Sequence, residues 1–288
     1  MTIYHAVIHT MTEAGTIPHG FLTVENGKIT CVQSGDPDTV TEDDLDAKGS
    51  LLLPGFIDAH THLGILEDGL DFEGDDCNEC TDPFTPHLRA IDGVNPLDRC
   101  FSEALAAGVT TVMTTPGSAN PCGGTMLILK TAGNCVDDMK LTFGGIKFAL
   151  GENPKSVYHG RDEMPFTRMA TAAIIREGLY KAKRYLEQWE AVEEAEDQPD
   201  YDAKCEALLP LLRREYKAHF HCHRADDMMT AIRIAKEFHL DAVLVHGTEG
   251  HRIPDIIQRA GVPIICGPIL CDRCKPELRD LEITTPNI

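Results

Sequence analysis

Two histidines near the N-terminal third of the chain have the spacing of metal ligands. His60 and His62 lie at the end of the apolar segment 51–60. Side chains alternate between the two faces of a β-strand, so both imidazoles would face the same side. Imidazole is a good ligand for Zn²⁺, Fe²⁺ and Mn²⁺. We therefore expect His60 and His62 to bind one metal ion.

Three further histidines also end strand-like segments. His221 and His223 end the segment 216–223, and His246 ends the segment 241–246. Histidines gathered at several strand ends have one economical explanation, which is a metal centre that activates water. We expect His221 and His246 to be ligands, and His223 to be a ligand or a group that contacts the substrate.

The segment 145–150 offers two alternatives for a further ligand. Lys147 lies inside this segment, and Glu152 follows it. A lysine inside a strand is normally buried or extends its amine towards water, but it can also be carbamylated and bridge two metal ions. Glu152 would provide a carboxylate instead. His219, earlier in its own strand, is expected to pack in the interior.

The elements that must position these residues alternate between strand and helix. From residue 51 the pattern is typical of βα units and a parallel sheet. No strand-like segment is followed by a GxGxxG or P-loop sequence, which disfavours an open nucleotide-binding sheet. The predicted strands are 51–60, 109–115, 126–129, 145–150, 216–223, 241–246 and 262–266. The predicted helices are 95–108 with Asn95 as N-cap and Pro96 in the first turn, 165–196, 202–214, 226–238 and 253–260.

The number of these units favours a barrel that is not complete. An eight-stranded (β/α)8 TIM barrel needs ~250 residues, with its active site at the C-terminal ends of the strands. Residues 51–288 supply about seven such units. We predict an α/β fold, namely a (β/α)8-type barrel that lacks its last strand.

Residues 1–50 have a different pattern of short strands and turns. Asn26-Gly27, between the apolar runs 20–24 and 29–33, is a strong hairpin signal. We therefore expect two domains, a small β-domain at 1–50 and the barrel at 51–288.

The charge and the apolar content of the sequence exclude some classes of binding partner. The chain has 26 basic and 46 acidic residues, a net charge of −20, which argues against nucleic acid. No apolar run reaches the roughly 18 residues of a membrane helix, and the first residues lack the features of a secretory signal. We expect a cytoplasmic protein.

Eleven cysteines in such a chain are expected to be reduced thiols. Two CxxC pairs, Cys77/Cys80 and Cys271/Cys274, could together bind a structural zinc ion. About 190 residues separate them, which favours free cysteines in two loops.

The segment Leu53-Pro54-Gly55-Phe56-Ile57-Asp58-Ala59-His60-Thr61-His62 resembles the opening strand of the amidohydrolase superfamily. Further stretches resemble its imidazolonepropionase-like and metal-dependent prolidase-like members. These stretches are 117–121, 151–155, 221–227 and 245–249. The resemblance covers essentially the whole chain, and residues 1–50 resemble the first half of the small β-sandwich that flanks the barrel.

The resemblance implies a ligand set and a cofactor. The ligands would be His60, His62, His221, His246 and either Glu152, which we favour, or Lys147. They would hold one or two divalent ions, with Zn²⁺ expected before Fe²⁺ or Mn²⁺. His223 and His246 would be the catalytic groups that stabilise the oxyanion. Arg224 and Asn120 would bind the substrate, and Arg89 would join them if the substrate carries a carboxylate.

The resemblance also implies an aspartate at the end of an eighth strand, which acts as general base. The chain ends at Ile288, and Asp272 and Asp280 are poor substitutes. We expect either a truncated product or a second chain that supplies this residue.

The expected activity is metal-dependent hydrolysis of a C–N bond. The substrate would be a small molecule such as a cyclic amide, an N-acyl amino acid or a dipeptide. The alternatives are a deaminase that uses the same site, and an inactive barrel fragment. A homo-oligomer is possible.

Overall fold

The computed structural model describes residues 1–194 and 198–268. These residues form two compact units, Met1–Phe56 and a second unit that begins at Ile57. Each unit is described by itself.

The N-terminal unit is a five-stranded sheet. Its strand order is β3-β2-β1-β4, with β5 also paired to β1. The predicted Asn26-Gly27 hairpin is confirmed, because both residues have positive φ angles, 51° and 73°, between β2 and β3. The strands are β1 (Thr2–His9), β2 (Thr16–Glu25), β3 (Lys28–Ser34), β4 (Leu45–Asp46) and β5 (Leu51–Leu52).

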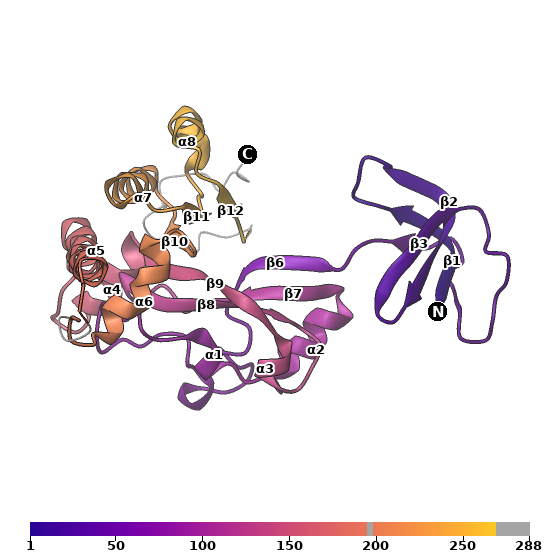
Figure 1. Cartoon of the computed structure of the whole chain (residues 1–288), viewed down its shortest axis with the longest axis horizontal. Helices are drawn as coiled ribbons and strands as arrows, with labels where there is room; N and C mark the ends of the chain where they lie inside the picture. The colour runs from indigo at the N-terminus through magenta and orange to yellow at the C-terminus, as the bar shows by residue number, and fades with distance from the viewer. Residues whose placement is uncertain (195–197, 269–288) are drawn as a thin grey trace. The chain divides into compact units, whose positions relative to one another are not determined.

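The second unit is built on a seven-stranded sheet with the order β12-β11-β10-β9-β8-β7-β6 (Figure 1). The strands from β9 to β12 are parallel to one another. The strands are β6 (Phe56–Thr61), β7 (Val109–Thr114), β8 (Cys122–Lys130), β9 (Lys140–Ala149), β10 (Lys217–Cys222), β11 (Ala242–His246) and β12 (Ile264–Cys266).

The expectation of βα units throughout is wrong at β8. This strand is antiparallel to both β7 and β9. Residues 115–121 connect β7 to β8, whereas a parallel crossover needs about a dozen residues or more. The connection is therefore too short for a helix, and the chain turns back on itself.

The sheet is strongly curled. β6 is one edge of the strand order and β11 is next to the other edge. Nevertheless, the ring centroids of His60, on β6, and His246, on β11, are 5.1 Å apart. The sheet is thus a nearly closed barrel, and side chains of β6 and β11 meet at the C-terminal end of β6.

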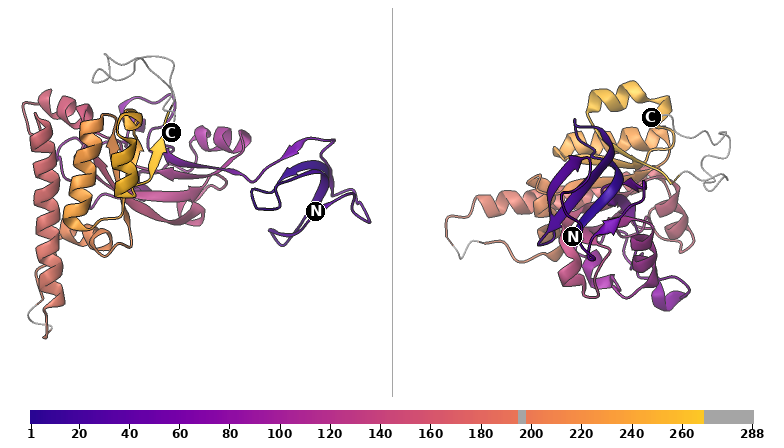
Figure 2. Two further views of the ribbon diagram at one scale, coloured as in Figure 1. Left: turned by 90° about the horizontal axis from the view of Figure 1, so that it is seen from above. Right: turned by 90° about the vertical axis from the view of Figure 1, so that its right-hand side faces the viewer.

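Helices cover the outside of the parallel strands. Figure 2 shows α5, α7 and α8 running side by side along this face. Apolar side chains of the strands, such as Phe148 and Phe220, pack there against Ile175 and Leu179 of α5. Each such buried side chain stabilises the fold by about 1.5–3 kcal/mol. The helices that cover the parallel strands are α5 (Arg168–Glu190), α6 (Ala203–Leu212), α7 (Ala225–Phe238) and α8 (Pro254–Ala260).

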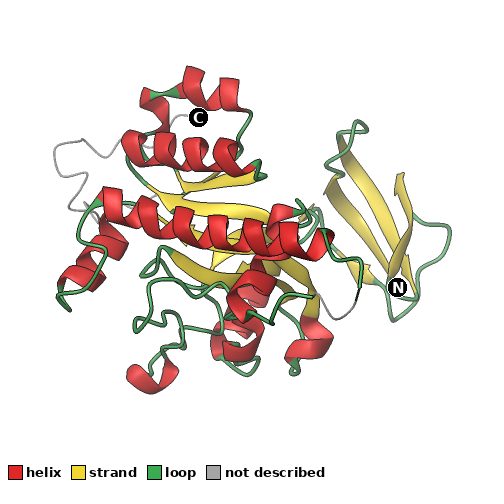
Figure 3. Ribbon diagram, turned by 60° about the vertical axis from the view of Figure 1, so that its left-hand side comes forward, coloured by secondary structure: helices red, strands yellow, loops and turns green. Residues whose placement is uncertain are grey.

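The segment between β6 and β7 is mostly loop, as the green ribbon of Figure 3 shows. The predicted N-cap Asn95 is wrong here. The cap of α2 is Asp98, whose carboxylate accepts from the backbone N–H of Cys100 at 3.1 Å, and Pro96 lies in the turn before the helix. The short helices are η1 (Phe72–Gly74), α1 (Ala90–Gly93), α2 (Arg99–Ala106), α3 (Val136–Met139), α4 (Glu152–His159) and η3 (Gly250–Arg252).

Cys77 is buried and Cys80 partly buried, and both are free thiols. Cys271 and Cys274 lie outside the described residues, as do Asp272 and Asp280. Among the helices of the described residues, none is long and apolar enough to cross a membrane.

Candidate metal centre

The alternation of β10 separates its histidines from its apolar side chains. Ala218, Phe220 and Cys222 belong to the core beneath the helices. The intervening side chains face the barrel interior, because alternate residues of a strand point to opposite faces. These are His219, His221 and, just after the strand, His223, and all three are buried.

His246 reaches the same interior in a different way. Ala242 and Leu244 of β11 pack under the helices, so strict alternation would point His246 outward. Its φ angle is 75°, a left-handed conformation that is uncommon for a residue other than glycine. This break in the strand turns the ring inward, where its centroid lies 4.6 Å from those of His221 and His223.

These three imidazoles are close enough to share an ion. One ring nitrogen from each of His221, His223 and His246 lies within 4.8 Å of the others. The rings of His223 and His246 are stacked, with 5° between their planes. His60 extends the group from β6, with His62 5.5 Å beyond it, measured between ring centroids. Five imidazoles therefore gather at the C-terminal ends of β6, β10 and β11.

Backbone carbonyls fix the tautomers of two rings. Nδ1 of His62 bonds to the carbonyl of Thr115 at 2.7 Å, and Nδ1 of His246 bonds to the carbonyl of Gly267. A carbonyl oxygen can only accept, so both Nδ1 atoms donate a proton. A neutral imidazole that donates from Nδ1 has its lone pair on Nε2, which is the arrangement of a metal-binding histidine.

Hydroxyl groups hold the two rings of β10. Nδ1 of His221 lies 2.8 Å from Oγ of Ser118, and Nδ1 of His223 lies 2.8 Å from Oγ1 of Thr248. Such outer contacts orient the imidazoles around a metal ion. Both hydroxyl residues lie in the stretches that resemble the amidohydrolase superfamily, 117–121 and 245–249. No pattern in the sequence, however, links either of them to a histidine.

His60 tests whether the site fits a metal ion. Its Nδ1 is buried and has no hydrogen-bond partner among the described residues. An unsatisfied buried polar atom costs about 1–3 kcal/mol, and coordination would remove that cost. Burial, and then the nearby charge of Lys147, lowers the pKa of His60. Burial likewise lowers the pKa of His62. Burial therefore favours the neutral form of both rings, which is the form that binds metals.

Lys147 is fully buried in β9, on the strand face opposite Ile146 and Phe148. Its ammonium donates to the carbonyl of Pro116 at 2.9 Å and to Oγ1 of Thr115 at 3.4 Å. Burial lowers the pKa of Lys147 to about 7. Burial therefore favours the uncharged form of this amine.

Glu152 is the first residue of α4 and is partly buried. His219 lies two residues before His221 on β10, and burial lowers its pKa to about 4. The choice between Lys147 and Glu152 as the ligand from this part of the chain stays a prediction.

Asn120 is held by three hydrogen bonds within the protein. Its amide donates to the carbonyl of Glu79 at 2.6 Å and to Oγ1 of Thr85 at 3.0 Å. Its side-chain oxygen accepts from the hydroxyl of Tyr158 at 2.6 Å. These contacts fix the loop before α1, so the predicted role of Asn120 in substrate binding would require an exchange of partners.

The predicted arginines are also paired. Arg224 forms a two-pronged contact with Asp226, at 2.9 and 3.0 Å, and Arg89 forms a similar one with Asp92. Their roles towards a substrate stay predictions.

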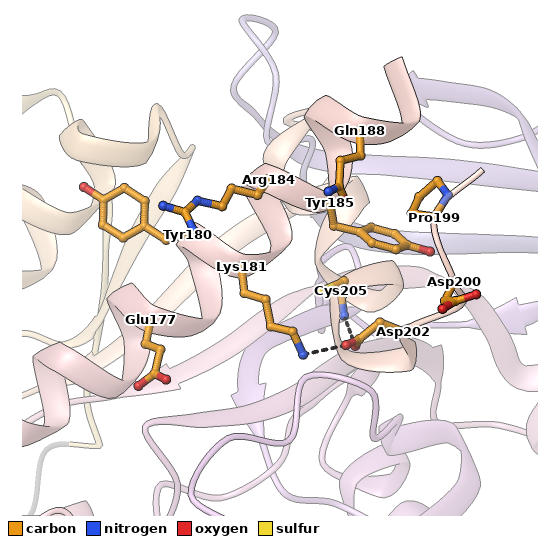
Figure 4. A pocket seen from close by; sticks show the side chains of 10 residues that line it. All are labelled: Glu177, Tyr180, Lys181, Arg184, Tyr185, Gln188, Pro199, Asp200, Asp202 and Cys205. Atoms are coloured by element: carbon orange, nitrogen blue, oxygen red, sulfur yellow. Dashed lines mark hydrogen bonds and ion pairs between the residues drawn. The ribbon is translucent and has the colours of Figure 1, made fainter. Parts of the chain in front are cut away.

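Two of the hollows in the second unit differ in the residues that line them. One, of about 860 Å³, is lined by the 72–93 segment and by Pro116, whose carbonyl accepts from Lys147. Neither Lys147 nor any of the five imidazoles lines it, and Pro116 is its link to the candidate metal centre. The other lies between α5 and α6, where Lys181 pairs with Asp202 (Figure 4). None of the candidate residues lines this second hollow.

Residues 51–266 match the Amidohydrolase family. The chain belongs to this family. The structure is also similar to the crystal structure of an amidohydrolase from Thermotoga maritima MSB8, with a TM-score of 0.90 and 41% identity, covering 97% of this chain and 73% of that one.

Two curated relatives add to this finding. The amidohydrolase tasK of Hapsidospora irregularis is 30% identical over 266 residues, which is 83% of this amidohydrolase but 27% of the relative. A 5-methylthioadenosine/S-adenosylhomocysteine deaminase of Bacillus thuringiensis (strain Al Hakam) is 40% identical over 65 residues, 22% of this chain and 15% of its own. This chain thus spans well under two thirds of either curated relative.

Proposed function

We propose that this amidohydrolase chain carries the metal-binding part of a hydrolase that cleaves C–N bonds in small molecules. The observation that carries the proposal is the set of five imidazoles at one barrel rim. Four of them have Nδ1 held against an oxygen atom. The donor set suits Zn²⁺, Fe²⁺ or Mn²⁺, and we propose Zn²⁺.

One or two ions held there would lower the pKa of a water molecule towards neutrality and polarise the scissile carbonyl. The protein's own groups would do the rest. His62 and His246, fixed through Nδ1, would present Nε2 as ligands. Glu152, the first residue of α4, would be the further ligand, with Lys147 as the alternative once it is carbamylated by carbon dioxide. His223 would donate a hydrogen bond to the developing oxyanion.

We propose a cyclic amide, an N-acyl amino acid or a dipeptide as the substrate. The cavity lined by Pro116, whose carbonyl accepts from Lys147, supports a small molecule, because a site of several hundred Å³ is typical for one. Arg89, in the wall of that cavity, would bind a substrate carboxylate after leaving Asp92.

The test begins with metal binding, measured by equilibrium dialysis with Zn²⁺. His62→Ala and His221→Ala should each weaken binding, whereas His159→Ala, an exposed histidine on α4, should not. If the two interior variants bind zinc as tightly as the wild type, the proposed centre is refuted.

Activity is then assayed on the zinc-loaded chain with the three substrate classes, with and without a chelator. Hydrolysis that the chelator abolishes supports the proposal.

A second candidate is a deaminase, favoured by the local similarity to the Bacillus thuringiensis enzyme. Release of ammonia from amino-purine nucleosides, without amide hydrolysis, would favour it. Zinc binding without either reaction would mean that this chain alone is inactive.

A further inference from the structure

The N-terminal unit contains a second cluster of side chains of the types that bind metals, separate from the candidate metal centre. His5 of β1 and His19 of β2 both point their Nε2 atoms at Asp36, which follows β3. The distances to Oδ1 of Asp36 are 3.5 Å from His5 and 2.8 Å from His19. The two rings are stacked, with centroids 5.6 Å apart. Three strands of this small sheet thus bring their polar side chains to one point.

The backbone is distorted at this place. The pairing of β1 with β2 shifts register between Ile3 and Ala6. His5 lies in this bulge with a φ angle of 53°, and its carbonyl accepts from the backbone N–H of Gly49 at 2.7 Å. Bulges change the direction of a side chain, and a left-handed non-glycine residue costs of order 1 kcal/mol or more. The backbone conformation that directs His5 towards Asp36 is therefore locally unfavourable in free energy.

His5 lies between two carboxylates, those of Asp36 and Asp46. Its Nδ1 lies 2.9 Å from Oδ1 of Asp46. An ionised carboxylate can only accept, so Nδ1 must carry the proton. In a neutral ring the lone pair of Nε2 would then face the carboxylate of Asp36, and two electron-rich atoms would oppose each other. Either a second proton on His5 or a metal ion resolves this conflict.

We propose that His5, His19 and Asp36 bind one divalent transition-metal ion, with Zn²⁺ as the reference ion, and that Asp46 orients His5. Two imidazoles and one carboxylate are a usual zinc ligand set, and a carboxylate behind a ligating histidine is its usual outer partner. The ion would sit about 2.0–2.1 Å from each nitrogen, so the rings must move closer. The side chains have room for this, since those of His5, His19 and Asp36 are 43%, 54% and 62% exposed.

The experiment counts zinc bound by the full chain at equilibrium, with a weak competing chelator. The double variant His5→Ala/His19→Ala should bind one equivalent less than the wild type. His9→Ala is the matched control, because this histidine lies on the same strand and contacts Thr16 rather than the cluster. It should leave the count unchanged.

Two further variants keep the test informative if the double variant unfolds, which circular dichroism would reveal. Asp46→Asn should keep the equivalent but weaken its affinity about 10–100-fold, as loss of an outer partner does. His19→Gln should weaken it at least as much. Equal zinc counts and affinities in the wild type and all three cluster variants would overturn the proposal.

Nuclear magnetic resonance of the imidazole C–H signals separates a metal ion from a proton. Zinc should shift the signals of His5 and His19 at neutral pH. Signals that respond to pH but not to zinc would also overturn the proposal, and would mean that His5 is simply protonated. The result is independent of the barrel site, because His62→Ala should remove zinc there and leave the equivalent of the N-terminal unit.

Discussion

Replacing Lys147 with methionine should stabilise the metal-free protein at neutral pH. Lys147 is fully buried, and this burial lowers its pKa from 10.5 to about 7. Methionine has a similar length and no charge to bury. The substitution should nevertheless remove a group on which the proposed metal centre depends, so stability and activity should change in opposite directions.

The expected magnitude follows from the two pKa values, which differ by about 3.5. At about 1.4 kcal/mol for each pKa unit, burying the charged lysine costs roughly 5 kcal/mol. The variant also loses the hydrogen bonds to Pro116 and Thr115, each worth about 1 kcal/mol. The net stabilisation should therefore be about 3 kcal/mol at or below pH 7.

The stability difference between the wild type and Lys147→Met should depend on pH. Below pH 7 both the folded and the unfolded chain hold the proton, so the full cost is present. Between pH 7 and about 10.5 the unfolded chain holds more protons than the folded one, and the wild type gains stability as the pH rises. The advantage of Lys147→Met should therefore shrink across this range and reverse towards pH 10, where the lost hydrogen bonds remain.

The assay is urea unfolding with a chelator in buffer free of carbon dioxide, which excludes carbamylation. Wild type and Lys147→Met are compared from pH 6 to pH 10, because titrating groups that do not interact with Lys147 cancel in the difference. Lys236→Met, at an exposed position of α7, is the control and should show a small, constant difference. A difference for Lys147→Met that does not change with pH would refute the reasoning.

Two other substitutions test the packing and the orientation of the site. Ser118→Ala removes the hydroxyl 2.8 Å from Nδ1 of His221 and should reduce zinc affinity about 10–100-fold, measured by competition with a chelator; unchanged affinity would show that the ring needs no such partner. Gly178→Ala places a Cβ 1.9 Å from the ring of Phe84 and should destabilise the fold by about 1–3 kcal/mol. Gly160→Ala, whose Cβ would have no neighbour nearer than 3.5 Å, is its control, and equal unfolding midpoints for the two variants would contradict the predicted clash.

The sequence predicted the positions of the strands better than their direction. Apolar runs identify where a strand passes through the core, and the observed strands of the second unit include or overlap all seven predicted ones. Direction depends on the connection. Residues 115–121 contain no helical pattern, and their length alone would have indicated that β8 turns back.

The candidate site was predictable where simple periodicity operates. The spacing of His60 and His62 brought them close together, as expected. His246 could not be placed by periodicity, because its ring turns inward through a left-handed backbone angle. The carbonyls of Thr115 and Gly267 could not be found either, since every residue has a carbonyl and only the fold selects which one faces a ring.

The antiparallel turn-back at β8 has a consequence for the order in which the site assembles. β7, β8 and β9 contact one another over short distances along the chain, whereas β6 and β11 meet across nearly the whole unit. Local contacts form faster because less loop entropy is lost. The three-stranded hairpin array, which brings Thr115, Ser118 and Lys147, should therefore fold before the strands that carry His221 and His246. In pulse-labelled hydrogen exchange, the amides of this array should be protected first. The groups that orient the imidazoles would then be in place before the imidazoles themselves.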